Sequence, residues 1–321
     1  MKFSPTAEQA DFVASLDKLL AGADTPGAAR AWAGGNHEPG LTLWSRLAEQ
    51  GVSALVIPEE SGGFGATAVE LVLAHEVLGR HVVPGPWIES SAYLARAATG
   101  ELQEQVAEGL VATVAVPAVS AYALDADVAA QAYLSSAGSL SDLDTSALDE
   151  PTSAIDPVRR LFAVTSEPAS DPLPDDPAFD LAALAASAQL LGLGEKILAE
   201  TVAYALQRHQ FGRAIGSYQA IKHQLADVRI ALDFARPLVW GAALADGTAE
   251  FARAVSAAKV KAGDAAYLAS RVGLQVHGAI GYTRELDLSL WLLRTRALVN
   301  AWGTPAQHRA RILESLVAER G

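Results

Sequence analysis

The sequence predicts a mainly α-helical protein with three parts: a helical N-terminal domain (residues 1–108), a small β-domain with a linker (109–178) and a C-terminal four-helix bundle (179–321). Three observations predict this fold. Apolar residues recur every three to four positions through the first part, which is the period of a helix. The middle part holds short apolar runs separated by Ser, Asp, Gly and Pro, a pattern typical of strands and turns. The last part consists of long helical patterns.

In the N-terminal domain, the first predicted helix follows Ser4 or Thr6, because either side chain can cap it. A second helix is predicted around Trp44. A third is predicted over residues 69–79 and is expected to end at its last residue, a glycine. The glycine-rich segment 57–65 allows two interpretations, a phosphate-binding loop or a tight turn. We favour the turn because no strand precedes the segment and no lysine follows it.

In the β-domain, the predicted strands lie at residues 111–117, 129–134 and 161–165. The domain closes with residues 168–177, a segment that contains four prolines. Proline removes a backbone donor and fixes φ, so we expect this segment to be a linker without regular structure.

The C-terminal bundle begins with a helix over residues 181–207, for which Asp180 is the expected N-cap. This stretch has no proline, and its apolar residues cover most of the helix circumference, so we expect it to be buried among other helices. Further helical patterns cover residues 218–246, 249–277 and the chain from about 285 onward. Pro237 is expected to end or kink the first of these.

The composition limits the kinds of partner. The formal net charge of −13 argues against a nucleic-acid partner, which needs a basic surface. The absence of cysteine excludes disulfides and thiolate metal sites, and the seven histidines show no metal-ligand spacing. No run of 18 uncharged apolar residues indicates a membrane span, and the first residues form no apolar signal region. We therefore expect a soluble cytoplasmic protein with no metal, nucleic-acid or membrane partner.

An anionic ligand such as a CoA ester needs a local cluster of basic side chains. The residues best placed along the sequence to supply one are Arg208, Arg213, Lys222, Arg294 and Arg296.

Two segments of the C-terminal part carry a family resemblance. Residues 208–227 read Arg-His-Gln-Phe-Gly-Arg-Ala-Ile-Gly-Ser-Tyr-Gln-Ala-Ile-Lys-His-Gln-Leu-Ala-Asp, and residues 275–283 read Gln-Val-His-Gly-Ala-Ile-Gly-Tyr-Thr. Together they resemble the flavin-contacting segments of acyl-CoA dehydrogenases, in the same order and at a similar separation. Segments 44–52, 57–65 and 76–80 are similar to the family as well, so the resemblance covers the whole chain. It implies an acyl-CoA dehydrogenase-like fold.

In that family FAD lies at a subunit interface, and the adjacent subunit reaches across to its pyrophosphate and adenosine. Arginine suits a diphosphate because it offers several N–H donors, and glycine lets backbone N–H groups approach the anion. Alanine in place of the family's second glycine keeps its N–H, so that departure is mild. Without the rest of the motif, Arg208 would be assigned to a surface ion pair and Phe211 to the core of the bundle. The resemblance implies FAD-binding roles for Arg208, Phe211, Gly212, Gln219, Gln275, Gly278 and Ala279.

The positions at which the family places its catalytic glutamate hold other residues here. Proton abstraction from the acyl thioester requires a desolvated carboxylate close to the substrate. The three family locations correspond to Ala182, Gln189 and Trp302, none of which is a base. Glu195 and Glu200 lie on the same helix, and we expect them to be solvated or ion-paired instead. The resemblance therefore implies no catalytic residue in this chain.

The β-domain departs from the family too. Full-length members carry a Leu-Thr-Glu-Pro…Gly-Ser-Asp segment and a Trp-Ile-Thr/Ser segment that hold the flavin ring, and neither occurs between residues 110 and 178. Residues 121–128 are only a poor remnant, so the β-domain is truncated. Residues 153–160 look like a segment of the short subunits in actinobacterial heteromeric steroid acyl-CoA dehydrogenases.

The resemblance thus implies a non-catalytic subunit of an α2β2 enzyme, completing the FAD site of a full-length acyl-CoA dehydrogenase subunit. The substrate would be a bulky, steroid side-chain-like acyl-CoA, and electrons would pass to an electron-transfer flavoprotein. Two alternatives remain: a self-sufficient homomeric dehydrogenase with an unrecognised base, and a flavin-free interaction protein on the same scaffold.

Overall fold

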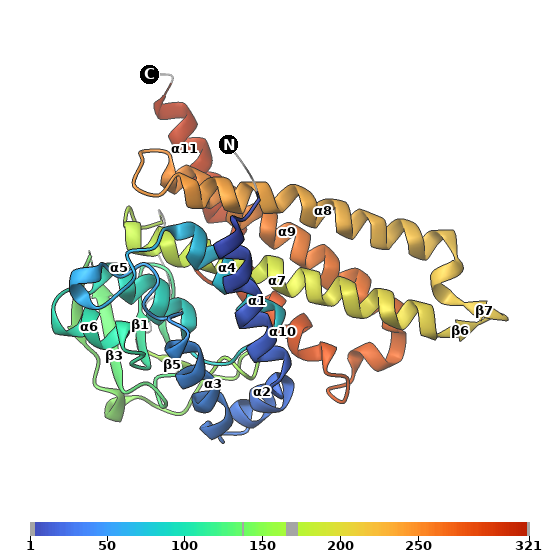
Figure 1. Cartoon of the computed structure of the whole chain (residues 1–321), viewed down its shortest axis with the longest axis horizontal. Coiled ribbons are helices and arrows are strands. Elements are labelled where there is room, and N and C mark those ends of the chain that lie inside the picture. Colours follow the sequence, from blue (N-terminus) through green and yellow to red (C-terminus); the bar gives the residue numbers. More distant parts are fainter. Residues whose placement is uncertain (1–3, 137, 165–172, 320–321) are drawn as a thin grey trace.

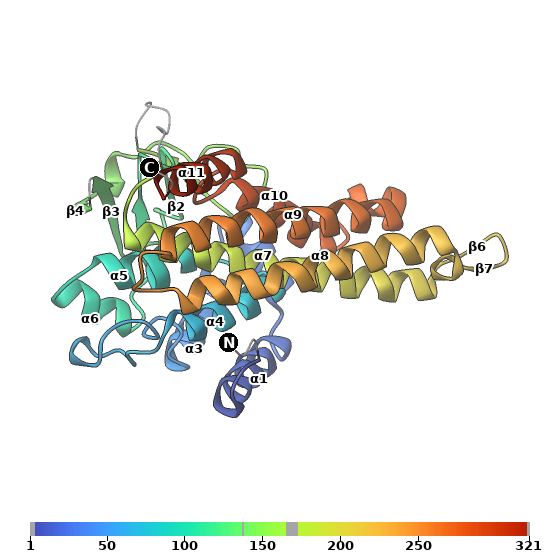
Figure 2. The same ribbon diagram turned by 90° about the horizontal axis from the view of Figure 1, so that it is seen from above.

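The computed structural model describes residues 4–136, 138–164 and 173–319, and this part of the chain is mainly helical (Figure 1). Long helices form a bundle that extends beyond the rest of the molecule. The small sheets lie near one end of the bundle, and a short hairpin lies at the other end (Figure 2). We call the end that carries the hairpin the free end.

The N-terminal helices are α1 (Ala7–Ala21), α2 (Thr25–Ala33), α3 (Glu38–Glu49) and α4 (Ala68–Arg80). Of the two cap candidates for α1, Thr6 is the cap. The Thr6 hydroxyl accepts a hydrogen bond from the Gln9 backbone N–H (3.2 Å), and the Gln9 side chain accepts one from the Thr6 N–H (2.9 Å). Residues 57–65 form a turn with a short 3₁₀ helix, η1 (Glu59–Ser61), as predicted.

The predicted end of the third helix at Gly79 is wrong, because α4 continues to Arg80. Gly79 instead lies against the first helix of the bundle, where a Cβ would stand 2.2 Å from the backbone oxygen of Gln189. Gly192 plays the reciprocal role, since its Cβ would stand 1.9 Å from the backbone oxygen of Glu76. The two glycines let the helix backbones touch, so Gly79 serves packing rather than helix termination.

The middle of the chain forms two small sheets. Before them come a π-helical turn η2 (Glu89–Leu94), α5 (Ala95–Ala97) and α6 (Glu101–Ala107). The strands are β1 (Ala112–Ala115), β2 (Tyr122–Leu124), β3 (Gln131–Ser136), β4 (Ser139–Asp142) and β5 (Leu161–Ala163), with a 3₁₀ turn η3 (Thr145–Ala147).

In the first sheet β1 pairs in parallel with β3 and β3 pairs antiparallel with β4, while β2 and β5 form an antiparallel pair of their own. The three predicted strands correspond to β1, β3 and β5. The sequence analysis missed β2, which has three residues, and β4, which is mostly polar. Thr165 and the first half of the expected linker, residues 168–172, lie outside the described residues.

The bundle consists of α7 (Pro177–Gln207), α8 (Gln219–Leu244), α9 (Phe251–His277) and α10 (Leu288–Asn300), with α11 (Pro305–Ala318) packed against α9. The connection from α7 to α8 contains β6 (His209–Gln210), β7 (Arg213–Ala214) and the 3₁₀ turn η4 (Ile215–Ser217). Another 3₁₀ turn, η5 (Gly278–Tyr282), follows α9.

Two expectations for the bundle are corrected. The N-cap of α7 is Asp176, which accepts from the Ala178 N–H (2.9 Å), and Pro177 opens the helix inside the expected linker. Proline fits this first position because its missing N–H would have no helical partner there. Asp180 is not a cap but a buried partner of Arg311. Pro237 was expected to end or kink its helix, and the first of these outcomes does not occur, because α8 continues through Pro237.

The helix α7 is buried, as its apolar circumference predicts. By length and composition alone it could cross a membrane, but 89% of its most apolar window is buried inside the protein. The helices α4, α8, α9 and α10 all pack against it. An all-round apolar helix is therefore the core of this fold.

Candidate functional site

The free end of the bundle carries an exposed phenylalanine. Phe211 occupies the turn between β6 and β7, and its relative exposure is 92%. Phe211 (φ +52°) and Gly212 (φ +81°) both adopt left-handed conformations, as a type I′ hairpin turn requires. Glycine adopts this conformation freely, whereas a bulky side chain is an outlier there. The chain therefore holds an apolar ring out into solvent on a backbone conformation that phenylalanine disfavours.

The base of the hairpin is fixed to the adjoining helices. Arg208 follows α7, and its N–H donates to the Tyr204 carbonyl (2.9 Å). The guanidinium of Arg213 lies 3.9 Å from the ring centre of Tyr218, and the Tyr218 hydroxyl donates to the Gln210 carbonyl (3.2 Å). The side chain of Arg208 is exposed and makes no salt bridge with any described residue.

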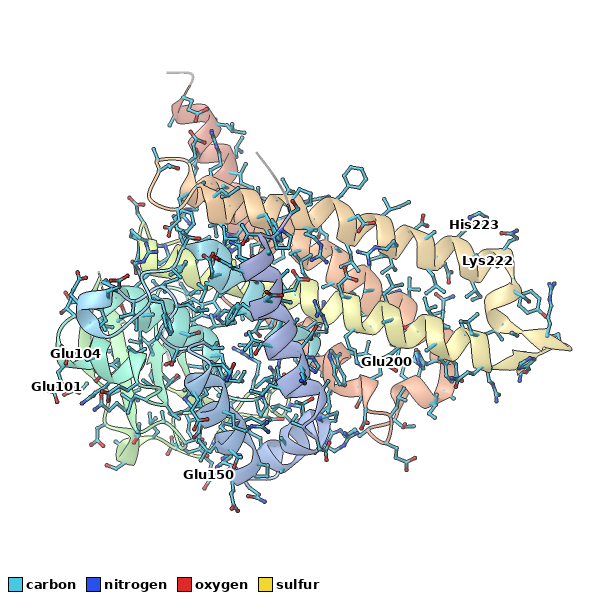
Figure 3. All side chains as sticks on the ribbon, viewed as in Figure 1. Glu101, Glu104, Glu150, Glu200, Lys222 and His223 are labelled. Atoms are coloured by element: carbon cyan, nitrogen blue, oxygen red, sulfur yellow. The ribbon has the colours of Figure 1, made fainter. Side chains whose placement is uncertain are left out.

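The first turn of α8 adds three exposed polar residues beside the hairpin. Gln219 is the first residue of the helix, and Lys222 and His223 follow on the outer surface (Figure 3). All three side chains face solvent, so they are available to a ligand or a partner subunit.

The second motif lies at the end of α9, beside the end of α7. The ring of His277 stacks on Tyr204 with ring centres 4.3 Å apart, and this contact brings the two motifs together. Gly278 has φ +62° and ψ −138°, a combination that only glycine adopts readily. Gln275 and Ala279 are exposed, and Ala279 has no positive φ. All seven predicted FAD-binding residues therefore lie at the free end of the bundle.

The three expected base positions lie elsewhere, in the packed interior. Ala182 is fully buried in α7. The Gln189 amide lies 3.1 Å from His75 Nδ1, and His75 Nε2 lies 3.0 Å from Ser91 Oγ. Because the Ser91 hydroxyl donates to the Trp87 carbonyl, it accepts from His75 Nε2–H, and the amide donates to Nδ1. This chain of hydrogen bonds is structural, and burial lowers the pKa of His75 to about 3.

Trp302, at the third base position, fills space next to Tyr93. The two rings stack with centres 5.5 Å apart, and Trp302 is 7% exposed. Its backbone is left-handed (φ +57°), and its carbonyl lies 2.9 Å from His308 Nε2. Lys259 fixes the same loop, since its ammonium donates to the carbonyls at the end of α10 (3.0 Å to Val299). The tryptophan is therefore held in place by a buried network.

One buried carboxylate near Trp302 was missed by the sequence analysis. Glu89, in η2, is 3% exposed, and its Oε2 has no hydrogen-bond partner among the described atoms. Burial raises the pKa of Glu89, and Arg159, 3.9 Å away, partly offsets this rise. Glu89, Arg159 and Trp302 line a cavity of about 60 Å³, which has room for only a few water molecules. The available signal in the sequence was a single charged residue inside the otherwise uncharged stretch 86–94.

A larger cleft of about 520 Å³ lies over the start of α7. Its lining includes Asp175 and Asp176, and no described lysine or arginine contributes to it. Tyr93 closes one wall, where its hydroxyl donates to Asp176 (2.9 Å). The negative charge of this cleft opposes the binding of a CoA phosphate.

Two further groups of charged residues have structural partners. Glu195 pairs with Arg229 and Arg236 (both 2.6 Å), and Glu200, which is labelled in Figure 3, pairs with Lys196 (2.6 Å), so both glutamates are ion-paired as expected. Arg294, expected in a basic cluster, is buried instead.

The partner of Arg294 is the buried carboxylate of Asp156, and its guanidinium also donates to the Val83 carbonyl (3.3 Å). The side chain cannot reach a ligand, so its inclusion in the basic cluster was wrong. The sequence could not exclude Arg294 from the cluster, because residue type alone does not show whether an arginine lies in a buried ion pair or on the surface.

Comparisons with known proteins give a consistent family relationship. The family model for the acyl-CoA dehydrogenase N-terminal domain matches residues 6–113, and that for the C-terminal domain matches residues 177–317. Acyl-CoA dehydrogenase IpdE2 of Mycobacterium tuberculosis is 35% identical over 312 residues, covering 96% of this chain and 95% of the relative. Acyl-CoA dehydrogenase IpdE2 of Mycolicibacterium smegmatis is 33% identical over 276 residues, covering 84% and 86%.

Solved structures give the same result for the fold. The Tcur3481-Tcur3483 steroid ACAD superimposes with a TM-score of 0.81 at 25% identity, covering 97% of this chain and 98% of the other. The ChsE4-ChsE5 complex from Mycobacterium tuberculosis gives a TM-score of 0.80 at 21% identity, with 99% of each chain covered. At that identity the second likeness concerns the fold alone.

Proposed function

The chain belongs to the acyl-CoA dehydrogenase family, and from that premise we propose that it is the non-catalytic subunit of an α2β2 enzyme that shares FAD with a full-length partner. Bound FAD would accept the hydride during α,β-dehydrogenation of an acyl-CoA. In this proposal the chain contributes contacts to the nucleotide end of the cofactor, and the partner supplies the ring site and the base.

The observation that carries the proposal is the exposed free end of the bundle. Phe211 is held in solvent on a disfavoured backbone, and backbone strain of this kind clusters at ligand-binding and other functional sites. Arg208 has no carboxylate partner among the described residues, and a guanidinium suits a diphosphate. Apart from Gly278 and its two chain neighbours, no described residue has an atom within 4 Å of the position of a Cβ on Gly278, which leaves its backbone accessible. These residues fit the nucleotide end of FAD.

The interior around the expected base positions supports the non-catalytic part of the proposal. Trp302 and Tyr93 fill the space beside a cavity of about 60 Å³, which is far smaller than the 300 Å³ or more of typical ligand pockets. The neighbouring cleft is lined by Asp175 and Asp176 without a basic residue. Neither space suits a CoA thioester.

The proposed substrate is a bulky acyl-CoA of the steroid side-chain type, with electron-transfer flavoprotein as the electron acceptor of the complex. The likeness to a steroid acyl-CoA dehydrogenase at 25% identity supports this substrate class. Likeness to a structure of a two-component complex, ChsE4-ChsE5, is consistent with an unlike partner.

Co-expression with a full-length acyl-CoA dehydrogenase from the same organism tests the proposal. We expect a yellow complex, and Arg208→Ala is expected to lower its flavin-to-protein ratio while both chains still associate. Arg46→Ala is the matched control, since Arg46 is also exposed, lies on α3 and forms no salt bridge with a described residue. The proposal would be contradicted if no flavin-containing complex forms. It would also be contradicted if the parent chain, Arg208→Ala and Arg46→Ala all give complexes with the same flavin-to-protein ratio.

A self-sufficient homomeric dehydrogenase is the second candidate, and Glu89 is the observation that favours it. This buried carboxylate has a raised pKa and lines a cavity beside Trp302, as a catalytic base would. The small cavity argues against this role, because a thioester cannot enter. The candidate predicts that the chain purified alone is yellow and that Glu89→Gln abolishes reduction of an acceptor by acyl-CoA.

A flavin-free interaction protein is the remaining candidate. It predicts a stable complex that contains no flavin, with Arg208→Ala leaving both properties unchanged. Arg208 forms no salt bridge with a described residue, and Gln219 and Gln275 are exposed. These three side chains argue against this candidate, because a purely apolar interface has no use for them.

A further inference from the structure

The middle of α8 presents a row of exposed apolar side chains. Ile230, Phe234 and Leu238 follow one another at four-residue intervals, and their relative exposures are 53%, 73% and 41%. Residues four apart on a helix lie on the same face, so the three side chains form one contiguous surface. An isolated exposed apolar residue is common in soluble proteins, whereas a contiguous apolar surface is typical of an interaction site. We call these three residues the α8 row.

The fold of the described chain leaves the α8 row uncovered. The helices α4, α7 and α9 pack against α8, whose buried residues include Val228, Leu232 and Val239. The α8 row lies on a different face of the helix, and α8 runs along the upper edge of the bundle in Figure 1. The α8 row is therefore available to a molecule outside this chain.

The α8 row is separate from the surface that we assign to the shared FAD. Gln219 opens α8, and Phe234 follows fifteen residues later, which is about 22 Å along a helix. The α2β2 stoichiometry, which belongs to the proposed function, requires a further contact that joins two FAD-sharing pairs. The α8 row is free to make this second contact while the hairpin and the first turn of α8 face the FAD.

The charges of α8 indicate which molecule covers the α8 row. The charged side chains of the helix all lie in residues 219–236, and they are Lys222, Asp227, Arg229, Asp233 and Arg236. Residues 237–244 carry no charge. If a two-fold axis crosses α8 near Phe234, two copies of the helix meet antiparallel, and the charged half of each lies against the uncharged half of the other. No like charges then meet, whereas a parallel contact would place each charge beside its own copy.

We propose that α8 is a self-association surface, on which a second copy of this chain packs antiparallel with Phe234 near the two-fold axis. In the α2β2 enzyme this contact joins the two FAD-sharing pairs. The α8 row has far fewer residues than the about 20 per side of a standard stable interface. The chain alone is therefore expected to dimerise weakly, with a dissociation constant roughly in the micromolar range.

Disulfide crosslinking tests the position of the axis. The chain contains no cysteine, so a single introduced cysteine reports on one position. Phe234→Cys is expected to give a disulfide-linked dimer under mild oxidation, because near the axis the two Cα atoms come within the about 7 Å that a disulfide spans. Leu244→Cys is the matched control, since Leu244 is also exposed on α8 (47%). In the antiparallel dimer its two copies would lie about 30 Å apart, so we expect no crosslink there.

Sedimentation velocity of the chain alone measures the strength of the contact. Phe234→Asp places two like charges near the axis, and we expect it to weaken dimerisation about tenfold or more. The side chain is exposed, so circular dichroism should show an unchanged fold. Leu313→Asp on α11 is the matched control, because Leu313 is 63% exposed and lies outside the α8 row, and it should dimerise like the parent chain.

Three results would overturn the proposal: a parent chain that stays monomeric at about 100 μM, equal dimerisation of Phe234→Asp and Leu313→Asp, or equal crosslinking at positions 234 and 244. If the parent chain is monomeric and Phe234→Asp instead blocks association with the full-length subunit, the α8 row binds the unlike subunit and our proposal is wrong.

The test is separable from that of the proposed function. In the complex, Phe234→Asp should convert α2β2 into αβ pairs that keep their flavin-to-protein ratio, whereas Arg208→Ala should lower this ratio without changing the mass. Self-association of the chain alone can succeed even if no flavin-containing complex forms. The failure of one proposal is therefore distinguishable from the failure of the other.

Discussion

At the scale of single residues, the molecule accepts local strain at the exposed tip of the hairpin. Phe211 holds a left-handed conformation in full solvent, although asparagine or glycine would suit the turn better. The sequence motif identified this residue, but only the structure could show its backbone conformation and its exposure. Taken alone, a phenylalanine in a helical region would be assigned to the core.

Phe211→Asn is expected to separate stability from assembly. The free energy of unfolding of the chain alone should rise by up to about 1 kcal/mol, because asparagine tolerates the left-handed turn. Association with the full-length partner should weaken, because the apolar ring is lost. Chemical denaturation and a pull-down of the two chains check both parts. A destabilised chain, or unchanged association, would contradict the assigned role.

His75 makes a prediction about pH. In the folded chain burial lowers the pKa of His75 from 6.5 to about 3, so between these values the unfolded chain binds a proton that the folded chain does not. Stability is therefore lost as the pH falls below about 6.5, by at most about 1.4 kcal/mol per pH unit from this residue.

Denaturation curves of the parent chain and of His75→Gln at several pH values between about 4.5 and 6 measure this contribution. The slope of unfolding free energy against pH should be smaller in the variant by about 1 kcal/mol per pH unit. Only the slope matters, so a constant loss of stability in the variant does not obscure the result. Equal slopes would mean that His75 is protonated in the folded chain.

At the scale of elements, the positions of the helices could be predicted from periodicity. The structural roles of individual glycines and charged residues could not. The long patterns predicted α7, α8 and α9 to within a few residues, because amphipathic spacing depends only on local sequence. Gly79 was assigned to a helix end because glycine serves both as a cap and as a close-contact residue. Its contact is with Gln189, which is distant in sequence.

Gly79→Ala tests the contact between α4 and α7. The new Cβ would meet a backbone oxygen that cannot move without shifting α7, so we expect a loss of about 2–3 kcal/mol in the free energy of unfolding. Gly241→Ala in α8 is the matched control, since among the described residues nothing beyond the adjoining backbone of α8 lies within 4 Å of its Cβ position.

That control substitution should stabilise the chain by up to about 1 kcal/mol, because alanine has the higher helix propensity. Thermal or chemical denaturation of the two variants measures both effects. If both changes had the same sign and size, close packing of α4 on α7 would not be the reason for Gly79.

At the scale of the whole molecule, the free end of the bundle is open and carries Arg208 and Arg213, which form no salt bridge with a described residue, while the interior around Trp302 is closed. Family-like motifs predicted the open end, because its residues lie in two continuous segments. The buried carboxylate of Glu89 and the acidic cleft with Asp175 could not be predicted, since they depend on contacts between elements distant in the chain.

The central claim is that this chain contacts FAD but does not hold it alone. The most direct test is the flavin content of the chain purified by itself after incubation with excess FAD. We predict a colourless protein that retains no flavin on gel filtration and is inert toward acyl-CoA, because one subunit provides only the contacts to the nucleotide end. Retention of about one FAD per chain, with the flavin bleached by an acyl-CoA, would contradict the account.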